Sequence, residues 1–196
     1  MTSSNTRSTE YDINPVFLDR WSPRAFTGEA ISERDLLTIL DAAHWAPSSY
    51  NSQPWRFIYA RKDTAHWDKL FGLLHPFNQS WVKAASALVI VVSDSTMLPP
   101  GKEQRVPSRT HSFDAGAAWG YLALQATMMG WAAHGMAGFD VDRAFTELNV
   151  PEGYRVEAAI AIGRKGDKSL LSEKMAAREA PSPRLALSEV ALEGGF

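Results

Sequence analysis

The sequence APSSYNSQPWRF at residues 46–57 stands at the corner between a predicted helix and a predicted strand. Pro47 disfavours α-helical geometry at Ala46, so the preceding helix is expected to end here. Residues 55–60 alternate aromatic with other side chains, which is typical of a strand. Between the two elements lies an unusual density of short polar side chains, those of Ser48, Ser49, Asn51, Ser52 and Gln53.

Two interpretations of this polar corner are open on the residues alone. The amide side chains of Asn51 and Gln53 each hold a donor beside an acceptor, as recognition of the edge of a heterocycle requires. Alternatively, the short side chains satisfy backbone groups that are left unpaired at the helix end. The corner is therefore either part of a binding site or a structural helix stop.

Helix-starting signals lie on both sides of the corner. Asn14 and Pro15 are typical of the first positions of a helix and predict a short helix through Asp19. Ser32, followed by Asp35, predicts the start of a second helix, and apolar residues then recur at helical spacing. Further helices are predicted at residues 64–74, 113–129 and 140–148.

Two continuous runs of apolar residues, at 87–92 and 156–162, predict strands that are buried on both faces. A sheet with few buried strands needs helices on both faces. Helices and strands are intermixed, without repeats or a linker, so one domain over residues 1–196 is predicted, with an α+β or three-layer α/β/α fold. Residues 94–110 are rich in proline, serine and charge and are expected to form a long loop.

The two chain ends and the helix predicted at residues 113–129 each have a distinctive composition. Residues 1–12 are expected to form a flexible arm, and residues 185–196 form a tail that has no core of its own. This tail is expected to pack on its own subunit or on a partner. The helix itself is expected to be buried and closely approached by other backbone, and a second copy of it would fit, because many of its residues are small: Ala115, Gly116, Ala117, Ala118, Gly120 and Ala123.

The composition of the 196 residues, with 45% hydrophobic and 21% charged, is that of an ordinary globular protein. A net charge of -2 favours neither nucleic acid nor a membrane surface as a partner. The absence of cysteine excludes disulfides, thiolate metal sites and cysteine nucleophiles. The N-terminal residues lack the apolar core of a signal peptide, and no apolar run is long enough to span a bilayer, so a cytoplasmic protein is expected.

Several common catalytic motifs are absent. The sequence contains neither a P-loop nor a G-x-G-x-x-G dinucleotide fingerprint, and it has no G-x-S-x-G nucleophile elbow. The five histidines are scattered, and none is paired with a carboxylate at helical ligand spacing. They are interpreted as structural residues, and no metal site is predicted.

Two other segments are candidates for ligand binding. The segment RWSPR at residues 20–24 brings Arg20, Ser22 and Arg24 together, and arginine forks match phosphate oxygens. Its alternative is a solvated basic surface. Gly135 and Gly138 allow a ligand to approach the backbone closely, or they form a plain turn between strand and helix.

Taken together, these segments resemble the nitroreductase family of FMN-dependent enzymes over about residues 15–190. RWSPRAF at 20–26 is similar to the family's phosphate-binding segment, and APSSYNSQPW at 46–55 to its most specific motif. GFD at 138–140 and PRL at 183–185 are similar to two later segments. The resemblance implies a central, mostly antiparallel sheet flanked by helices, in an intertwined homodimer.

The resemblance also implies two FMN molecules at the subunit interface of that homodimer. The phosphate would be held by Arg20, Ser22, Arg24 and Arg184. Residues 47–51 would reach the flavin from the partner subunit. Asn78 would lie at the pyrimidine edge, and the backbone of residues 136–138 would face the ring. The implied cofactor-binding residues are Arg20, Trp21, Ser22, Arg24, Pro47, Ser48, Ser49, Asn51, Asn78, Met136, Ala137, Gly138 and Arg184.

The family chemistry that the resemblance implies is hydride transfer in two half-reactions. NADH or NADPH reduces FMN and leaves, and a nitroaromatic, quinone or similar small acceptor then takes its place. This scheme requires no catalytic side chain. Trp21, Ala137 and Ser182 depart from residues common in the best-known members, which bears on the choice of substrate and of nicotinamide.

Two alternatives to the general reductase remain open. One is a specialised relative, such as a reductive dehalogenase or a flavin-consuming oxidase, in which residues 94–110 would cover the substrate. The other is a flavin-binding protein without enzymatic activity.

Overall fold

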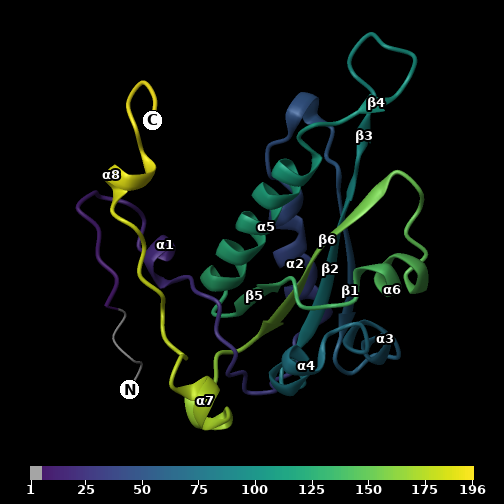
Figure 1. Cartoon of the computed structure of the whole chain (residues 1–196). Coiled ribbons are helices and arrows are strands. Elements are labelled where there is room, and N and C mark those ends of the chain that lie inside the picture. Colours follow the sequence, from purple (N-terminus) through teal and green to yellow (C-terminus); the bar gives the residue numbers. More distant parts are fainter. Residues whose placement is uncertain (1–5) are drawn as a thin grey trace.

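The computed structural model describes residues 6–196, and a four-stranded antiparallel sheet lies at its centre (Figure 1). The order of strands across the sheet is β1-β2-β6-β5, and every neighbouring pair is antiparallel. The strands are β1 (Trp55–Arg61), β2 (Ala87–Asp94), β5 (Ala132–Met136) and β6 (Tyr154–Gly163).

The two central strands are those predicted from continuous apolar runs. In β2, residues 87–93 are all buried, because the strand is paired on both sides and covered on both faces. The register between β2 and β6 shifts between Val91 and Val92, which pair with Ala158 and Val156 respectively. Glu157 is therefore the extra residue of a β-bulge.

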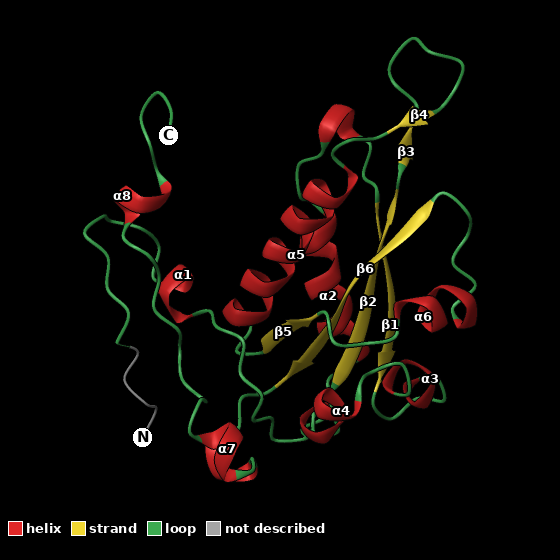
Figure 2. Ribbon diagram, in the orientation of Figure 1, coloured by secondary structure: helices red, strands yellow, loops and turns green. Residues whose placement is uncertain are grey.

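Helices cover both faces of the sheet, so the predicted three-layer arrangement is confirmed (Figure 2). Alternate residues of β2 point into two separate cores, with Val89 and Val91 on one face and Leu88 and Ile90 on the other. The first face packs against α2 (Glu33–His44) and α5 (His111–Met128). The second packs against α3 (Trp67–Phe71), α4 (Pro76–Val82) and α6 (Val141–Glu147).

The side-chain caps predicted for the helices are present. Ser32 Oγ accepts a hydrogen bond of 3.0 Å from the backbone N–H of Asp35 at the start of α2. Asn14 Oδ1 accepts one of 3.0 Å from Val16 in front of α1 (Val16–Asp19). Each bond satisfies a backbone donor that the first helical turn leaves unpaired.

Several details differ from the sequence-based prediction, and no helix was predicted after residue 148. β5 and α4 were not anticipated as a strand and a helix, and α3 is shorter than the predicted helix at residues 64–74. The expected loop at residues 94–110 contains a hairpin of β3 (Thr96–Met97) and β4 (Val106–Pro107). This hairpin is held by Arg105, which forms an ion pair with Asp94 and donates to Thr96 Oγ1 at 2.9 Å.

The two chain ends run beside each other, apart from the sheet (Figure 1). Residues 1–5 of the predicted arm lie outside the described residues, and Arg7 donates from Nε to the carbonyl of Ser182 at 2.9 Å. The remaining elements are η1 (Ser49–Asn51), η2 (Lys168–Leu170), α7 (Glu173–Ala176) and α8 (Leu187–Val190). Across residues 6–196, no helix combines the length and the apolar character that a membrane crossing demands.

Candidate functional site

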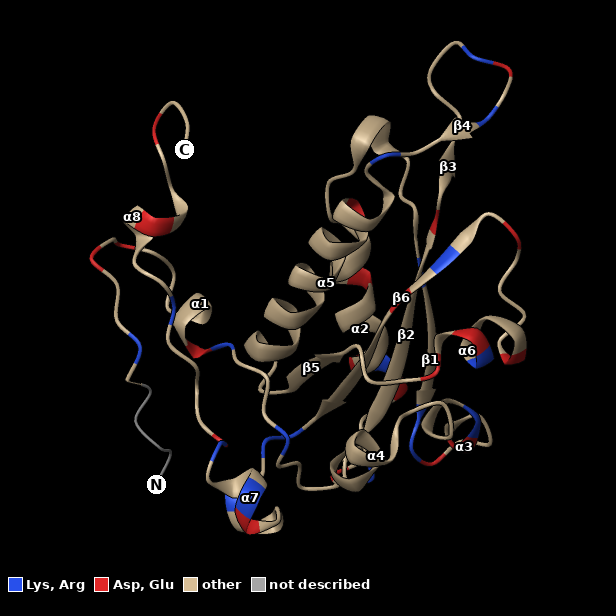
Figure 3. Cartoon of the chain, in the orientation of Figure 1, with Lys and Arg blue, Asp and Glu red and all other residues tan. Residues whose placement is uncertain are grey.

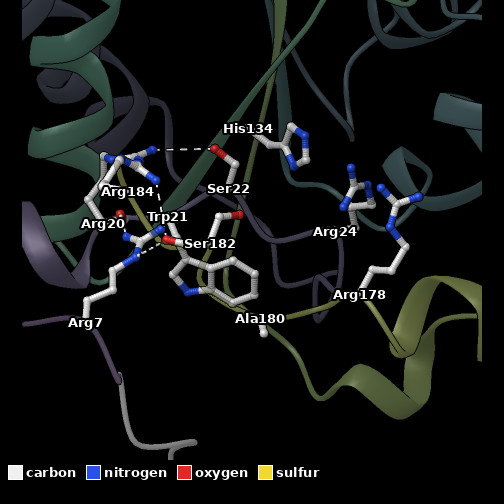
Figure 4. A pocket seen from close by; sticks show the side chains of 10 residues that line it. All are labelled: Arg7, Arg20, Trp21, Ser22, Arg24, His134, Arg178, Ala180, Ser182 and Arg184. Carbon is white, nitrogen blue, oxygen red and sulfur yellow. Dashed lines mark hydrogen bonds between the residues drawn. The ribbon is translucent and has the colours of Figure 1, made fainter. Parts of the chain in front are cut away.

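A basic pocket forms where the segment at residues 20–24 meets β5 and the chain that follows α7 (Figure 4). Its volume is ≈ 200 Å³. The polar residues come from segments that are far apart in sequence, so only folding brings them together. The lining residues are Arg7, Arg20, Trp21, Ser22, Arg24, His134, Arg178, Ala180, Ser182 and Arg184.

Three of the guanidinium groups in this pocket repel one another. Burial lowers the pKa of Arg20, and the nearby positive charge of Arg184 lowers it further. The pKa of Arg7 is lowered by burial and then by Arg184 and Arg20. Within residues 6–196, Arg20, Arg24 and Arg184 form no salt bridge with a carboxylate. An anion in the pocket would relieve this repulsion.

Arg7 connects the N-terminal segment by hydrogen bonds to residues 18–20 and to Ser182 at this end of the pocket. It donates from Nη1 to the carbonyl of Arg20 at 2.7 Å and to that of Leu18 at 3.1 Å. It also donates to Ser182, which is 175 positions further along the chain. Sequence reasoning missed Arg7, because a polar terminal segment offers no local signal of such a long-range contact.

The backbone of residues 23–25 is fixed from two sides. Glu179, which follows α7, accepts hydrogen bonds from the backbone N–H groups of Arg24 and Ala25 at 2.6 and 2.8 Å. His134 on β5 is hydrogen-bonded through Nδ1 to the carbonyl of Pro23 at 2.9 Å. This end of the arginine segment is therefore anchored to both the sheet and the C-terminal region.

A second surface surrounds Gly138, just beyond the end of β5. Asn78 on α4 donates from Nδ2 to the Gly138 carbonyl at 2.9 Å, and the backbone N–H of His75 donates to the same oxygen at 3.0 Å. A Cβ atom at Gly138 would lie 2.5 Å from Asn78 Nδ2, so any larger residue at this position would displace the Asn78 amide. Met136 buries its side chain in the core, whereas Ala137 is exposed.

Trp81 connects this second surface with the basic pocket. Its Nε1 donates to Asn78 Oδ1 at 3.3 Å. Its ring lies 4.7 Å from the ring of His134, measured between centroids, and the Arg24 guanidinium carbon lies 6.0 Å from the Trp81 ring centroid. Arg24, Trp81 and Asn78 thus form a continuous path from the pocket to Gly138.

The polar corner at residues 46–57 does not line this pocket. It lies at the start of α5, where the backbone N–H of Ser49 donates to Asp114 Oδ2 at 3.2 Å and Ser48 Oγ accepts from the N–H of Gln53 at 3.0 Å. The backbone at Tyr50, Asn51 and Gln53 has positive φ. Within the corner, Ser48 therefore pairs one backbone N–H, whereas the N–H of Ser49 is paired by Asp114 of α5.

The predicted site residues thus divide into three groups in one chain. Arg20, Trp21, Ser22, Arg24 and Arg184 line the pocket. The second surface carries the predicted residues that lie near Gly138, which are Asn78, Met136, Ala137 and Gly138. The corner residues Pro47, Ser48, Ser49 and Asn51 stay apart from both groups in the same chain.

Comparison with known proteins identifies the class of protein to which this fold and pocket belong. A model of the nitroreductase family matches residues 18–80 and 73–164, so the chain belongs to the nitroreductase family. The resemblance inferred from the sequence motifs is confirmed.

The chain is also similar to individual proteins over much of its length. The chain is 29% identical over 174 residues to the major NAD(P)H-flavin oxidoreductase of Aliivibrio fischeri, covering 68% of this chain and 78% of that protein. It is 42% identical over 126 residues to an uncharacterised 15.4 kDa protein of Mycolicibacterium smegmatis, covering 64% of this chain and 80% of that one.

Two solved structures have the same fold. One, described as an oxidoreductase containing FMN, is 53% identical with a TM-score of 0.94, and the match covers 100% of this chain and 98% of that one. The other, a Desulfovibrio desulfuricans protein solved in complex with FMN, is 28% identical with a TM-score of 0.71, over 96% of this chain and 99% of that one. The predicted nitroreductase-like fold is therefore confirmed.

Proposed function

We propose that this protein is an FMN-dependent oxidoreductase that takes a hydride from NADH or NADPH and passes it to a nitroaromatic, quinone or similar small acceptor. The observation that carries the proposal is the basic pocket, in which Arg20, Ser22, Arg24 and Arg184 converge from two distant segments. Support also comes from the FMN-containing structural relatives and from the NAD(P)H-flavin oxidoreductase of Aliivibrio fischeri.

The pocket fits the phosphate monoester of FMN. Arg20, Arg24 and Arg184 have no carboxylate salt-bridge partner within residues 6–196, and guanidinium groups bind phosphate oxygens in a bidentate manner. Arg20 donates from Nη1 to Ser22 Oγ at 3.4 Å, a long contact that a phosphate oxygen would replace. Each charge-assisted hydrogen bond to the phosphate would contribute about 1.5–3 kcal/mol.

The surface around Gly138 fits the flavin ring. Asn78 uses one amide hydrogen for the Gly138 carbonyl and its Oδ1 for Trp81, so the second amide hydrogen is left to donate to the pyrimidine edge. Gly138 has no side chain, and its backbone can approach a planar ring closely. Arg24, which lies over Trp81 between the two surfaces, places a positive charge beside this ring position.

When bound, FMN supplies the hydride chemistry between nicotinamide and acceptor. The chain's own residues hold the phosphate, orient the ring and keep positive charge near it, and none of them has to act as an acid or a base. Nicotinamide and acceptor occupy the same space in turn. This ordering explains why the sequence needs no dinucleotide-binding fingerprint.

A homodimer would complete the site, and α5 is the element we assign to its interface. One face of α5 is buried against the sheet, and the opposite face carries Gly116 and Gly120, where an added Cβ would meet no atom within 4 Å. Phe113 on this side is 80% exposed, and Asp114 is the one Asp, Glu, Lys or Arg of the helix (Figure 3). An apolar, lean face of this kind is typical of close helix packing.

In this homodimer, residues 47–51 of each chain would reach the FMN held by the partner. The tail at residues 185–196 would pack on the partner subunit, because it exposes Leu185, Leu187 and Val190 without covering them in its own chain. Obligate interfaces of this sort bury about 2,000–5,000 Å² in total.

The experiment that tests the proposal is anaerobic reduction of the FMN-loaded protein. Addition of NADH or NADPH is expected to bleach the flavin absorbance, and a nitroaromatic or quinone is expected to restore it. Bound FMN that neither nucleotide can reduce would contradict the reductase function and favour a flavin-binding protein without enzymatic activity. A screen of acceptors on the reduced protein would separate a general reductase from a specialised relative.

A further inference from the structure

His134 is a buried residue of the basic pocket that belongs to none of the family segments. It lies on β5, and its side chain lines the pocket together with the arginines (Figure 4). Only 9% of the residue is exposed. Its ring packs against Trp81, with a distance of 4.7 Å between centroids. The ring is therefore held in one orientation beside the position proposed for the phosphate.

The hydrogen bond to Pro23 determines which ring nitrogen carries the proton. Nδ1 lies 2.9 Å from the Pro23 carbonyl oxygen, which can only accept, so Nδ1 carries a hydrogen. In the neutral ring, Nε2 is then an acceptor and cannot donate to an anion. A protonated ring keeps the bond to Pro23 and gains an Nε2–H donor.

Charged groups from each neighbouring segment act on this ring. Burial lowers the pKa of His134, and the positive charge of Arg24 lowers it further, whereas the hydrogen bond to Pro23, the negative charge of Glu179 and the backbone of Ser22 raise it. Trp81, from α4, brings no charge. The other charged residues that line the pocket are Arg7, Arg20, Arg178 and Arg184, all cationic. The free pocket therefore favours the neutral ring.

We propose that His134 takes up a proton when a phosphate monoester enters the pocket and then donates from Nε2 to it, so that phosphate binding and proton uptake are linked. This inference rests on the proposed FMN phosphate site. It adds a third kind of contact to those of the arginines and of Ser22. It also predicts a pH dependence that arginines cannot provide, because they stay charged throughout.

The direction of the pH dependence follows from linkage. A bound dianion raises the pKa of His134 above its lowered value in the free pocket, so the proton is taken up on binding. FMN affinity must then rise as the pH falls through the interval between the two values. Each unit by which the anion raises this pKa corresponds to about a tenfold gain in affinity.

The test compares FMN dissociation constants between about pH 5.5 and about pH 8 in the wild type, His134→Asn and His66→Asn. The asparagine amide at position 134 can still donate to the Pro23 carbonyl but cannot be protonated. His66 is an exposed residue outside the pocket and is the matched control. FMN phosphate itself titrates near pH 6, and the His134→Asn curve measures that contribution alone.

A second readout counts protons directly. Isothermal titration of FMN in buffers of different ionisation enthalpy gives the number of protons taken up on binding. The wild type is expected to take up more protons than His134→Asn near pH 6.5, and its affinity advantage over that variant is expected to grow about tenfold towards low pH. Parallel curves with equal proton counts would overturn the inference while leaving the FMN site intact.

Sulfate, which stays a dianion over this range, gives a readout that does not depend on flavin. Thermal stabilisation of the FMN-free wild type by sulfate is expected to increase as the pH falls, and His134→Asn or His134→Gln is expected to remove that increase. If the wild type binds no FMN, the proposed function fails and the sulfate series decides the role of His134 separately. If stabilisation by sulfate is independent of pH, the proposed proton uptake by His134 is contradicted.

Discussion

Arg184 offers a sharp prediction, because its replacement should have opposite effects on ligand binding and on the stability of the free protein. In the structure Arg184 is exposed, and its Nη1 donates to the carbonyls of Ser182 and Pro183, at 3.3 and 3.0 Å, within its own segment. It also repels Arg20 and Arg7, whose pKa values it helps to lower. The side chain therefore contributes little to the fold and much to an anion site.

The expected magnitudes for Arg184→Ala differ accordingly. Loss of one charge-assisted contact with phosphate should weaken FMN binding by about 1.5–3 kcal/mol, which is about 10- to 150-fold in Kd. The free energy of unfolding of the FMN-free protein should change by less than about 1 kcal/mol, since the interactions lost are exposed. This free energy of unfolding should increase slightly, because a like-charge repulsion is removed.

Two titrations measure these effects on the same preparations. Quenching of flavin fluorescence gives the Kd of FMN, and urea unfolding without FMN gives the stability. Arg34→Ala, which removes an exposed arginine of α2 outside the pocket, is the matched control and should change neither quantity appreciably. Unchanged FMN affinity in Arg184→Ala, or a loss of several kcal/mol from the free protein, would refute this reasoning.

Three further substitutions test other parts of the structure. Arg24→Ala should weaken FMN retention by about 1.5–3 kcal/mol, measured by dialysis, and unchanged retention would remove Arg24 from the site. Gly116→Leu should leave the isolated fold intact but shift the protein from dimer to monomer in sedimentation, since its own chain offers no clash there; an unchanged dimer would exclude this face as the interface. Gly163→Ala should lower the free energy of unfolding by about 1–3 kcal/mol, because the new Cβ would lie 2.7 Å from Cδ1 of buried Phe26. If Gly163→Ala unfolds in urea like the wild type, Phe26 can move aside at no cost in stability.

The elements that the sequence predicted well are those with strong local signals. The apolar runs of β2 and β6 and the cap of α2 at Ser32 each act over a few residues. β5 is different, because its sequence AAHGM contains no β-branched residue. Its extended conformation comes from pairing with β6, as in the register of Ala133 with Ile162, which no local pattern indicates.

The candidate site divides along the same line. The arginine segment and Gly138 could each be found by a motif, because each lies in a short stretch of sequence that is similar to a family segment. Arg7 and His134 could not, since their partners Ser182 and Pro23 are 175 and 111 positions away. His134 was interpreted as one of five scattered structural histidines, and only the folded pocket distinguishes it from the others.

The comparison of FMN with riboflavin tests the central claim most directly, because the two differ only in the phosphate. If the phosphate lies among Arg20, Arg24 and Arg184, FMN should bind at least about a hundredfold more tightly than riboflavin at low salt, from two or more charge-assisted contacts. The ratio should shrink in Arg184→Ala. Equal affinities of the wild type for FMN and riboflavin would contradict a phosphate site in the basic pocket.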